Sequence, residues 1–64
     1  MEQKISIFVG SVTAIKQGDL LVIQSLLVEV TKVTEGAFNM TFETMTNEGL
    51  IKEYTFGKEY FLSY

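Results

Sequence analysis

The sequence contains no cysteine, histidine, arginine, proline or tryptophan, and several of these absences exclude a class of chemistry. Without cysteine and histidine there is no disulfide, no thiol or imidazole catalysis and no ordinary structural zinc site. Without arginine the chain lacks the bidentate donor that reads phosphates and guanine edges. We therefore expect a protein that is not an enzyme and has no catalytic residue, cofactor or metal site.

The acidic residues that remain show no catalytic or metal-binding spacing. Asp19 follows Gly18 in an expected turn, while Glu29, Glu43 and Glu53 fall at strand positions that would face water. No pair of carboxylates has a spacing typical of acid/base catalysis or of calcium or magnesium binding. The five glycines are isolated, so a glycine-rich phosphate loop is excluded as well.

Size and composition indicate one small domain, residues 1–64, that contacts another chain. Sixty-four residues lie near the lower limit for a single self-supporting core, yet 47% of them are hydrophobic and the mean hydropathy is +0.23. With no disulfide or metal to stabilise the fold, this apolar surplus favours a homo-oligomer.

Charge and hydropathy also limit the choice of partner. The five basic residues, all lysine, are dispersed along a chain of net charge -3, which disfavours nucleic acid. No apolar run approaches the roughly 18 residues needed to span a bilayer, and the N-terminus does not resemble a secretory signal. We expect a cytoplasmic protein that binds protein and not membranes.

Alternating apolar and polar residues predict strands along most of the chain, so the expected fold class is all-β. The densest apolar stretch, residues 18–30, is the expected centre of the core. It opens with a turn at Gly18-Asp19 and holds two strands, residues 20–23 and 26–30, joined by the polar pair at residues 24–25.

A β-bulge is predicted at residues 31–32, because Val33 follows Val30 after three positions and breaks the two-residue period. The hairpin that follows is predicted to turn at residues 35–36, which would pair Val33 with Phe38.

A second hairpin is predicted with its loop at residues 45–49. In the register we expect, Phe42 lies opposite Lys52 and Met40 opposite Tyr54. Apolar and aromatic side chains then share one face, and the other face is polar and exposed to water.

The N-terminal residues 4–9 alternate as a strand and are followed by an expected bend or bulge at residues 10–11. Ile5, Ile7 and Val9 would share one face of this strand. It could be a lone edge strand, or it could pair with a second subunit that covers this face; we therefore identify these three residues as candidates for self-association.

The C-terminal end is predicted to form a turn or one 3₁₀ turn at residues 57–60 and a short strand at residues 61–64. Four aromatic residues near the chain ends either close the core or a subunit interface, or form a partner-binding patch. These candidate partner-binding residues are Phe8, Tyr60, Phe61 and Tyr64.

The order of elements over about residues 16–64 resembles the small SH3-like barrel that SH3, Tudor and KOW-type domains share. Three features carry the resemblance: Gly18-Asp19 before the strand 20–23, the stretch 28–33, and residues 57–60 before the last strand. It implies a five- to six-stranded antiparallel barrel, here with an extra N-terminal strand. No functional residue carries over, since there is no tryptophan for a polyproline groove.

These observations favour a small acidic non-enzymatic protein-interaction module. Its size, its acidity and a reading frame that begins at Met1 suit an accessory factor or a phage-type inhibitor that binds a larger host protein. Two alternatives remain: a nucleic-acid-binding small barrel, and a small-ligand sensor whose pocket forms between subunits.

Overall fold

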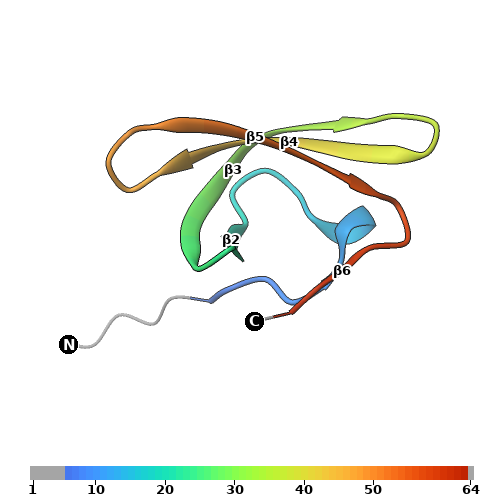
Figure 1. Ribbon diagram of the computed structural model, residues 1–64, viewed down its shortest axis with the longest axis horizontal. Helices are drawn as coiled ribbons and strands as arrows, with labels where there is room; N and C mark the ends of the chain where they lie inside the picture. The colour runs from blue at the N-terminus through green and yellow to red at the C-terminus, as the bar shows by residue number, and fades with distance from the viewer. Residues whose placement is uncertain (1–5, 64) are drawn as a thin grey trace.

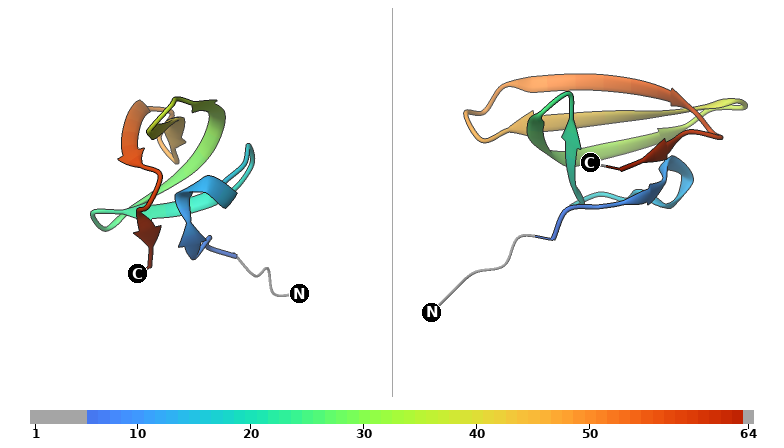
Figure 2. Two further views of the ribbon diagram at one scale, coloured as in Figure 1. Left: turned by 90° about the vertical axis from the view of Figure 1, so that its right-hand side faces the viewer. Right: turned by 60° about the horizontal axis from the view of Figure 1, so that its bottom comes forward.

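The computed structural model describes residues 6–63 and shows an all-β chain with one short 3₁₀ helix (Figure 1). In chain order the elements are β1 (Gly10–Ser11), η1 (Val12–Ala14), β2 (Leu20–Ile23), β3 (Leu26–Glu35), β4 (Asn39–Thr46), β5 (Ile51–Gly57) and β6 (Phe61–Leu62). Strands β2 to β5 form one antiparallel sheet in sequence order, and β1 pairs with β6. The larger sheet curls into a half-barrel (Figure 2).

The core lies between the concave face of this sheet and the segments around η1 and β6. The sheet and its neighbours contribute nine buried apolar side chains: Leu21, Ile23, Val28, Val30, Met40 and Phe42 from the sheet, with Val12, Ile15 and Leu62 from outside it. Four of the nine fall within residues 18–30, so that stretch contributes to the core, while the other five come from elsewhere in the chain. The all-β class is confirmed, and the curled sheet is compatible with a barrel.

The turn between β2 and β3 has an unusual backbone conformation. Its two central residues, Gln24 and Ser25, have φ angles of 53° and 67° and lie between the paired residues Ile23 and Leu26. Two positive φ angles in a two-residue hairpin are typical of a type I′ turn, which strongly favours Asn-Gly. Neither residue of this pair is one that adopts the left-handed region readily.

Replacing this pair with Asn-Gly (Gln24→Asn with Ser25→Gly) is expected to raise the free energy of unfolding by about 1 kcal/mol, because both residues then suit left-handed φ angles. Urea denaturation followed by circular dichroism measures the change. Ser25→Ala alone is the control, and it should give no gain. A double variant less stable than the wild type would contradict the left-handed turn.

The predicted bulge in β3 is confirmed. Val30 pairs with Thr44 and Lys32 with Glu43, which leaves Thr31 as the extra residue. The Thr31 hydroxyl donates a hydrogen bond of 2.9 Å to the carbonyl oxygen of Glu43. This bond gives the carbonyl a donor at the point where the bulge interrupts the β3–β4 pairing. The bulge keeps both Val30 and Val33 on the side of the core.

The predicted β3–β4 register is wrong. Glu35 pairs with Met40, the connection between the strands is residues 36–38, and the Gly36 N–H donates to the carbonyl of Asn39, the first residue of β4, at 2.8 Å. Phe38 lies at the tip, 81% exposed, and Val33 faces Phe42 instead. The register differs by four residues, an even number, so every side chain keeps its face and the apolar pattern alone does not separate the two.

The predicted β4–β5 register is also wrong, by two residues. Phe42 pairs with Tyr54, and Met40 pairs with Phe56. The loop is tighter than expected, because the Thr46 N–H donates to the Leu50 carbonyl at 2.8 Å and Gly49 takes a φ of 87°. The predicted separation into an apolar face and a polar face is confirmed. The aromatic side chains of β5 pack against the core, and on the outer face the hydroxyl oxygens of Thr41 and Thr55 are 3.1 Å apart.

The N-terminal prediction is wrong for residues 6–9, while Lys4 and Ile5 lie outside the described residues. Only Ile7 forms a bridge, a parallel one to Leu20, and the Phe8 N–H donates to the Leu20 carbonyl at 2.8 Å. Gly10–Ser11, where a bend or bulge was predicted, is strand β1. Its pairing with β6 within the same chain provides strand hydrogen bonds at this point.

The C-terminal prediction holds for its turn and part of its strand. The Tyr60 N–H donates to the Gly57 carbonyl at 3.0 Å, which closes a turn at residues 57–60. The predicted strand at residues 61–64 is shorter in the structure, where β6 covers residues 61–62. Tyr64 lies outside the described residues. A 3₁₀ helix does occur in the chain, but at Val12–Ala14, where the Ser11 hydroxyl accepts a bond from the Thr13 N–H.

An ion pair joins the end of β3 to the turn before β6. The Lys58 Nζ lies 2.8 Å from a carboxylate oxygen of Glu35. This hydrogen bond, together with the positive charge of Lys58, holds the pKa of the Glu35 carboxyl below its ordinary value of 4.5. The pair therefore stabilises the fold above pH 4.5, and that contribution is lost as pH falls through the lowered pKa.

Lys58→Met is expected to return the pKa of Glu35 toward 4.5, because the hydrogen bond and the charge are both removed. Carboxyl-carbon NMR titration of both proteins measures it. An unchanged Glu35 titration in the variant would show that the ion pair does not form in solution.

Candidate functional site

The outer face of the sheet, opposite the core, carries exposed apolar side chains in one region. Leu27 on β3, Met45 on β4 and Ile51, the first residue of β5, are 37%, 40% and 64% exposed. Leu50, in the turn directly before β5, is 56% exposed. The register places Met45 directly opposite Ile51 on the neighbouring strand. We call Leu27, Met45, Leu50 and Ile51 the outer apolar patch.

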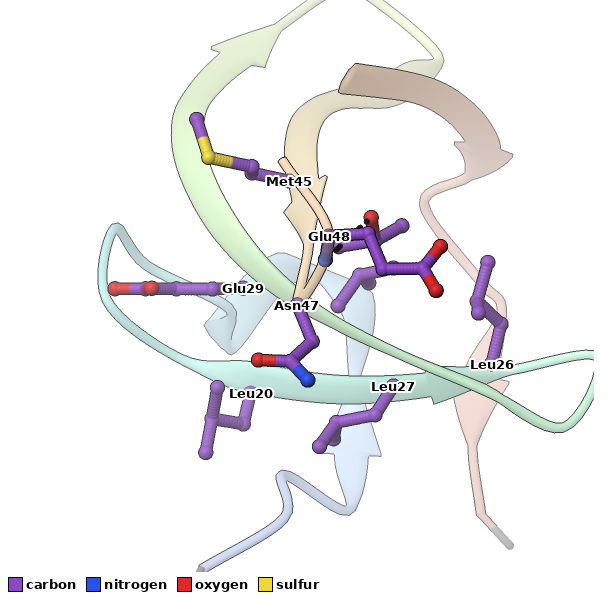
Figure 3. Close-up of a pocket in the computed structure, with 9 residues that line it drawn as sticks. Leu20, Leu26, Leu27, Glu29, Met45, Asn47 and Glu48 are labelled. Carbon is purple, nitrogen blue, oxygen red and sulfur yellow. Dashed lines mark hydrogen bonds between the residues drawn. The ribbon is translucent and has the colours of Figure 1, made fainter. Parts of the chain in front are cut away.

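A cleft adjoins this patch where β4 separates from β3. Their pairing begins at Val28 and Thr46, so the first two residues of β3 pair only with β2. The β4–β5 turn diverges there and leaves a cleft of about 580 Å³ (Figure 3). The residues that line it are Leu20, Leu26, Leu27, Val28, Glu29, Met45, Thr46, Asn47 and Glu48.

One buried threonine fixes the wall of the cleft that the β4–β5 turn provides. The hydroxyl of Thr46, a residue only 8% exposed, accepts hydrogen bonds from the N–H groups of Glu48 at 3.3 Å and Leu50 at 3.1 Å. The Gly49 N–H donates to the Thr46 carbonyl at 2.9 Å. Asn47 and Glu48 are therefore presented by a defined turn, and a cleft that is formed in advance costs less to order on binding.

The charge around the cleft and patch is mainly negative. Glu29 and Glu48 line the cleft, and Glu43 lies directly opposite Glu53 on the same outer face. Lys32 is paired in register with Glu43, but within residues 6–63 the single ion pair is the distant one between Lys58 and Glu35. In that same part of the chain no three carboxylates are grouped closely enough to hold a metal ion.

The aromatic patch predicted from the sequence is only partly assembled. Tyr60 and Phe61 are 48% and 62% exposed, and the Tyr60 ring stacks on Phe56 with centroids 4.9 Å apart. Phe8 is half-buried and packs against the core, and Tyr64 lies outside the described residues. A role for Tyr60 and Phe61 in partner binding stays a prediction.

The predicted self-association residues are also separated by the structure. Ile7 is half-buried and bridges to Leu20 of its own chain, whereas Val9 is 52% exposed. Ile5 lies outside the described residues. Self-association through this segment remains a prediction.

Sequence reasoning missed the outer apolar patch, although a signal for it exists. Leu27 alternates with the core-facing residues Leu26 and Val28, and Met45 alternates with the buried Thr44 and Thr46. Both are apolar at positions where a half-buried strand ordinarily carries a polar residue. Such out-of-phase apolar residues indicate an exposed apolar surface once the strand phase is known.

Across residues 6–63 there is no helix with the length and apolar character needed to cross a membrane. The chain matches no protein-family model, no curated protein and no solved structure, so the outer patch and its cleft are the observations from which a function is argued.

Proposed function

We propose that this chain is a non-enzymatic protein-interaction module of the cytoplasm that binds a larger protein through its cleft and outer apolar patch. The observation that carries the proposal is the grouping of Leu27, Met45, Leu50 and Ile51 beside a cleft of about 580 Å³. Exposed apolar residues scattered singly need no explanation, whereas a contiguous group with a polar rim is typical of a binding surface.

The fold we propose is the small SH3-like barrel. The bulged long strand β3, the turn at residues 57–60 before β6 and the curled order of β2 to β5 support it. The 3₁₀ helix at Val12–Ala14 departs from the expected pattern, which had that element at residues 57–60. An experimental structure in which β1, β6 and the curled sheet close one barrel would establish this finer assignment.

Charge favours a protein over nucleic acid as the partner at this surface. Glu29 and Glu48 would face the phosphates of any strand laid in the cleft, and repulsion there opposes binding. A phage-type inhibitor or accessory factor remains the biological setting we propose, on the basis of size and acidity. The homo-oligomer we propose uses the segment around Val9, which is exposed and is not itself a lining residue of the cleft, although the neighbouring Ile7 bridges to the lining residue Leu20.

Affinity capture from nuclease-treated lysate of the source organism tests the binding function. Met45→Asp introduces a charge into both the patch and the cleft, and it should remove any stoichiometric protein that the wild type retains. Phe38→Asp is the matched control, because Phe38 is 81% exposed but lies at the far β3–β4 connection. It should retain the same protein.

Three results would contradict the proposed function: no protein retained by the wild type, equal retention by Met45→Asp, or loss of all partners on nuclease treatment. Circular dichroism of each variant verifies that it is folded before capture. Met45 is 40% exposed and projects away from the core, so the substitution should leave the fold intact.

A further inference from the structure

We propose that the segment bound by the cleft and outer apolar patch is cationic and amphipathic, with leucine-like side chains on one stripe and lysine or arginine beside it. This inference rests on the proposed function, since it names the chemistry of the partner at the same surface.

The outer face is organised in rows that run across the strands. One row joins Glu29, Met45 and Ile51, and the next joins Lys32, Glu43 and Glu53. Neighbouring strands are about 4.8 Å apart, and the two rows are separated by two residues along β4 and β5, about 7 Å. Along β3 they are separated by three residues, because the bulge adds Thr31. On β4 and β5 an apolar pair, Met45 and Ile51, therefore lies beside an acidic pair, Glu43 and Glu53, at a fixed spacing.

That spacing matches an amphipathic segment. Residues three or four apart on a helix lie about 5–6 Å from one another, so an apolar stripe and a basic stripe can cover the two rows together. A bound segment that places apolar side chains on Met45 and Ile51 puts its flanking cations over Glu43 and Glu53. Glu48, which lines the cleft, adds a third carboxylate at its edge.

The Glu43–Glu53 pair places two like charges opposite each other in the isolated protein, and Lys32, opposite Glu43 on β3, offsets part of their repulsion. The two residues are direct cross-strand partners on β4 and β5, a position in which like charges are destabilising. Within residues 6–63 neither forms an ion pair. A cation of the partner placed between them would relieve this repulsion, and that relief is gained only in the complex.

The same charges disfavour a second copy of this chain as the occupant. The chain has a net charge of -3, and the outer face of a second copy would present the same glutamates. Apolar contact between two such faces would bring acidic rows together, at a cost that grows as salt falls.

The test is the binding of two designed peptides to the full chain, measured by fluorescence anisotropy at low and physiological salt. One 14-residue peptide carries a helical leucine stripe flanked by lysines, and its match has glutamate in place of every lysine. The lysine peptide should bind and weaken as salt rises. The glutamate peptide should bind at least tenfold more weakly.

Two double variants separate the acidic row from net charge. Glu43→Gln with Glu53→Gln should weaken the lysine peptide roughly threefold to tenfold, since exposed charge pairs contribute modestly. Glu35→Gln with Glu59→Gln removes the same charge elsewhere and should change binding by less than twofold. The proposal would be overturned if the two double variants changed the affinity for the lysine peptide equally, or if the two peptides bound the wild type equally well.

A second readout concerns the protein alone. Glu43→Gln with Glu53→Gln should raise the melting temperature by about 2–4 °C at low salt, and high salt should reduce that gain. No gain at low salt would refute the cross-strand repulsion.

Failure of this proposal is distinguishable from failure of the proposed function. If Met45→Asp abolishes capture of the native partner but the charge variants and salt leave that capture unchanged, the interaction surface stands and the cationic chemistry is wrong. If Met45→Asp has no effect on capture or on the lysine peptide, both are wrong.

Discussion

Phe42→Ala should leave most of the protein unfolded at 25 °C. Phe42 is fully buried, lies at the centre of the core on β4, and packs its ring 6.2 Å from that of Phe56. Truncating a buried phenylalanine costs about 3–5 kcal/mol. A 64-residue domain has a total stability of about 3–10 kcal/mol, toward the low end without disulfide or metal.

Circular dichroism with urea denaturation measures this loss. Phe38→Ala is the matched control, because Phe38 is 81% exposed at the tip of the β3–β4 connection, and it should change stability by less than about 0.5 kcal/mol. A Phe42→Ala protein that kept a cooperative transition near the wild-type midpoint would mean that Phe42 is not packed in the core.

Deleting Thr31 together with Lys32 should cost about 2–4 kcal/mol. Thr31 is the extra residue of the bulge, so its removal alone restores the two-residue alternation and keeps Val33 on the core side. Removal of Lys32 as well moves the end of β3 by one position relative to β4 and turns Val33 outward. The hydrogen bond from Thr31 to the Glu43 carbonyl is lost at the same time.

Deleting Thr31 alone is the matched control, and it should cost only about 1 kcal/mol, for the lost hydroxyl bond. Amide hydrogen exchange of β3 and β4 distinguishes the two variants, since only the double deletion should lose protection along the hairpin. A single deletion that cost as much as the double deletion would contradict the assignment of Thr31 as the extra residue.

Strand positions were predictable from the sequence because they depend on a local pattern. The run 20–23 is recovered as β2, and the phase slip before Val33 correctly located the bulge. Register was not predictable in the same way. Sliding β4 by an even number of residues leaves Met40 and Phe42 on the core face, so the alternative pairings all satisfy the apolar pattern.

The hydrogen bonds of the connections select among those registers. Gly36 bonds to Asn39 across one connection, and Thr46 holds the other through its hydroxyl. The second is a side-chain contact that depends on the final geometry, which explains why a threonine among other polar residues gave no signal in advance.

The candidate site was missed for a related reason. The aromatic residues Tyr60 and Phe61 attract attention in a sequence because their types are common at interfaces. Leu27 and Met45 are ordinary apolar residues, and only their position out of phase with the core makes them informative. The cleft beside them arises where β4 leaves β3, a feature of tertiary structure that no short motif encodes.

The most direct test of the central claim, that the outer apolar patch and its cleft form the binding surface, is methyl NMR of the methionines. The chain has three, and two of them report opposite faces of β4: Met45 is 40% exposed on the outer face, whereas Met40 is 5% exposed in the core. With ¹³C-methyl methionine label and the captured partner added, the Met45 signal should shift or broaden while Met40 stays nearly unchanged. A bound complex in which the Met45 signal does not move would contradict the account.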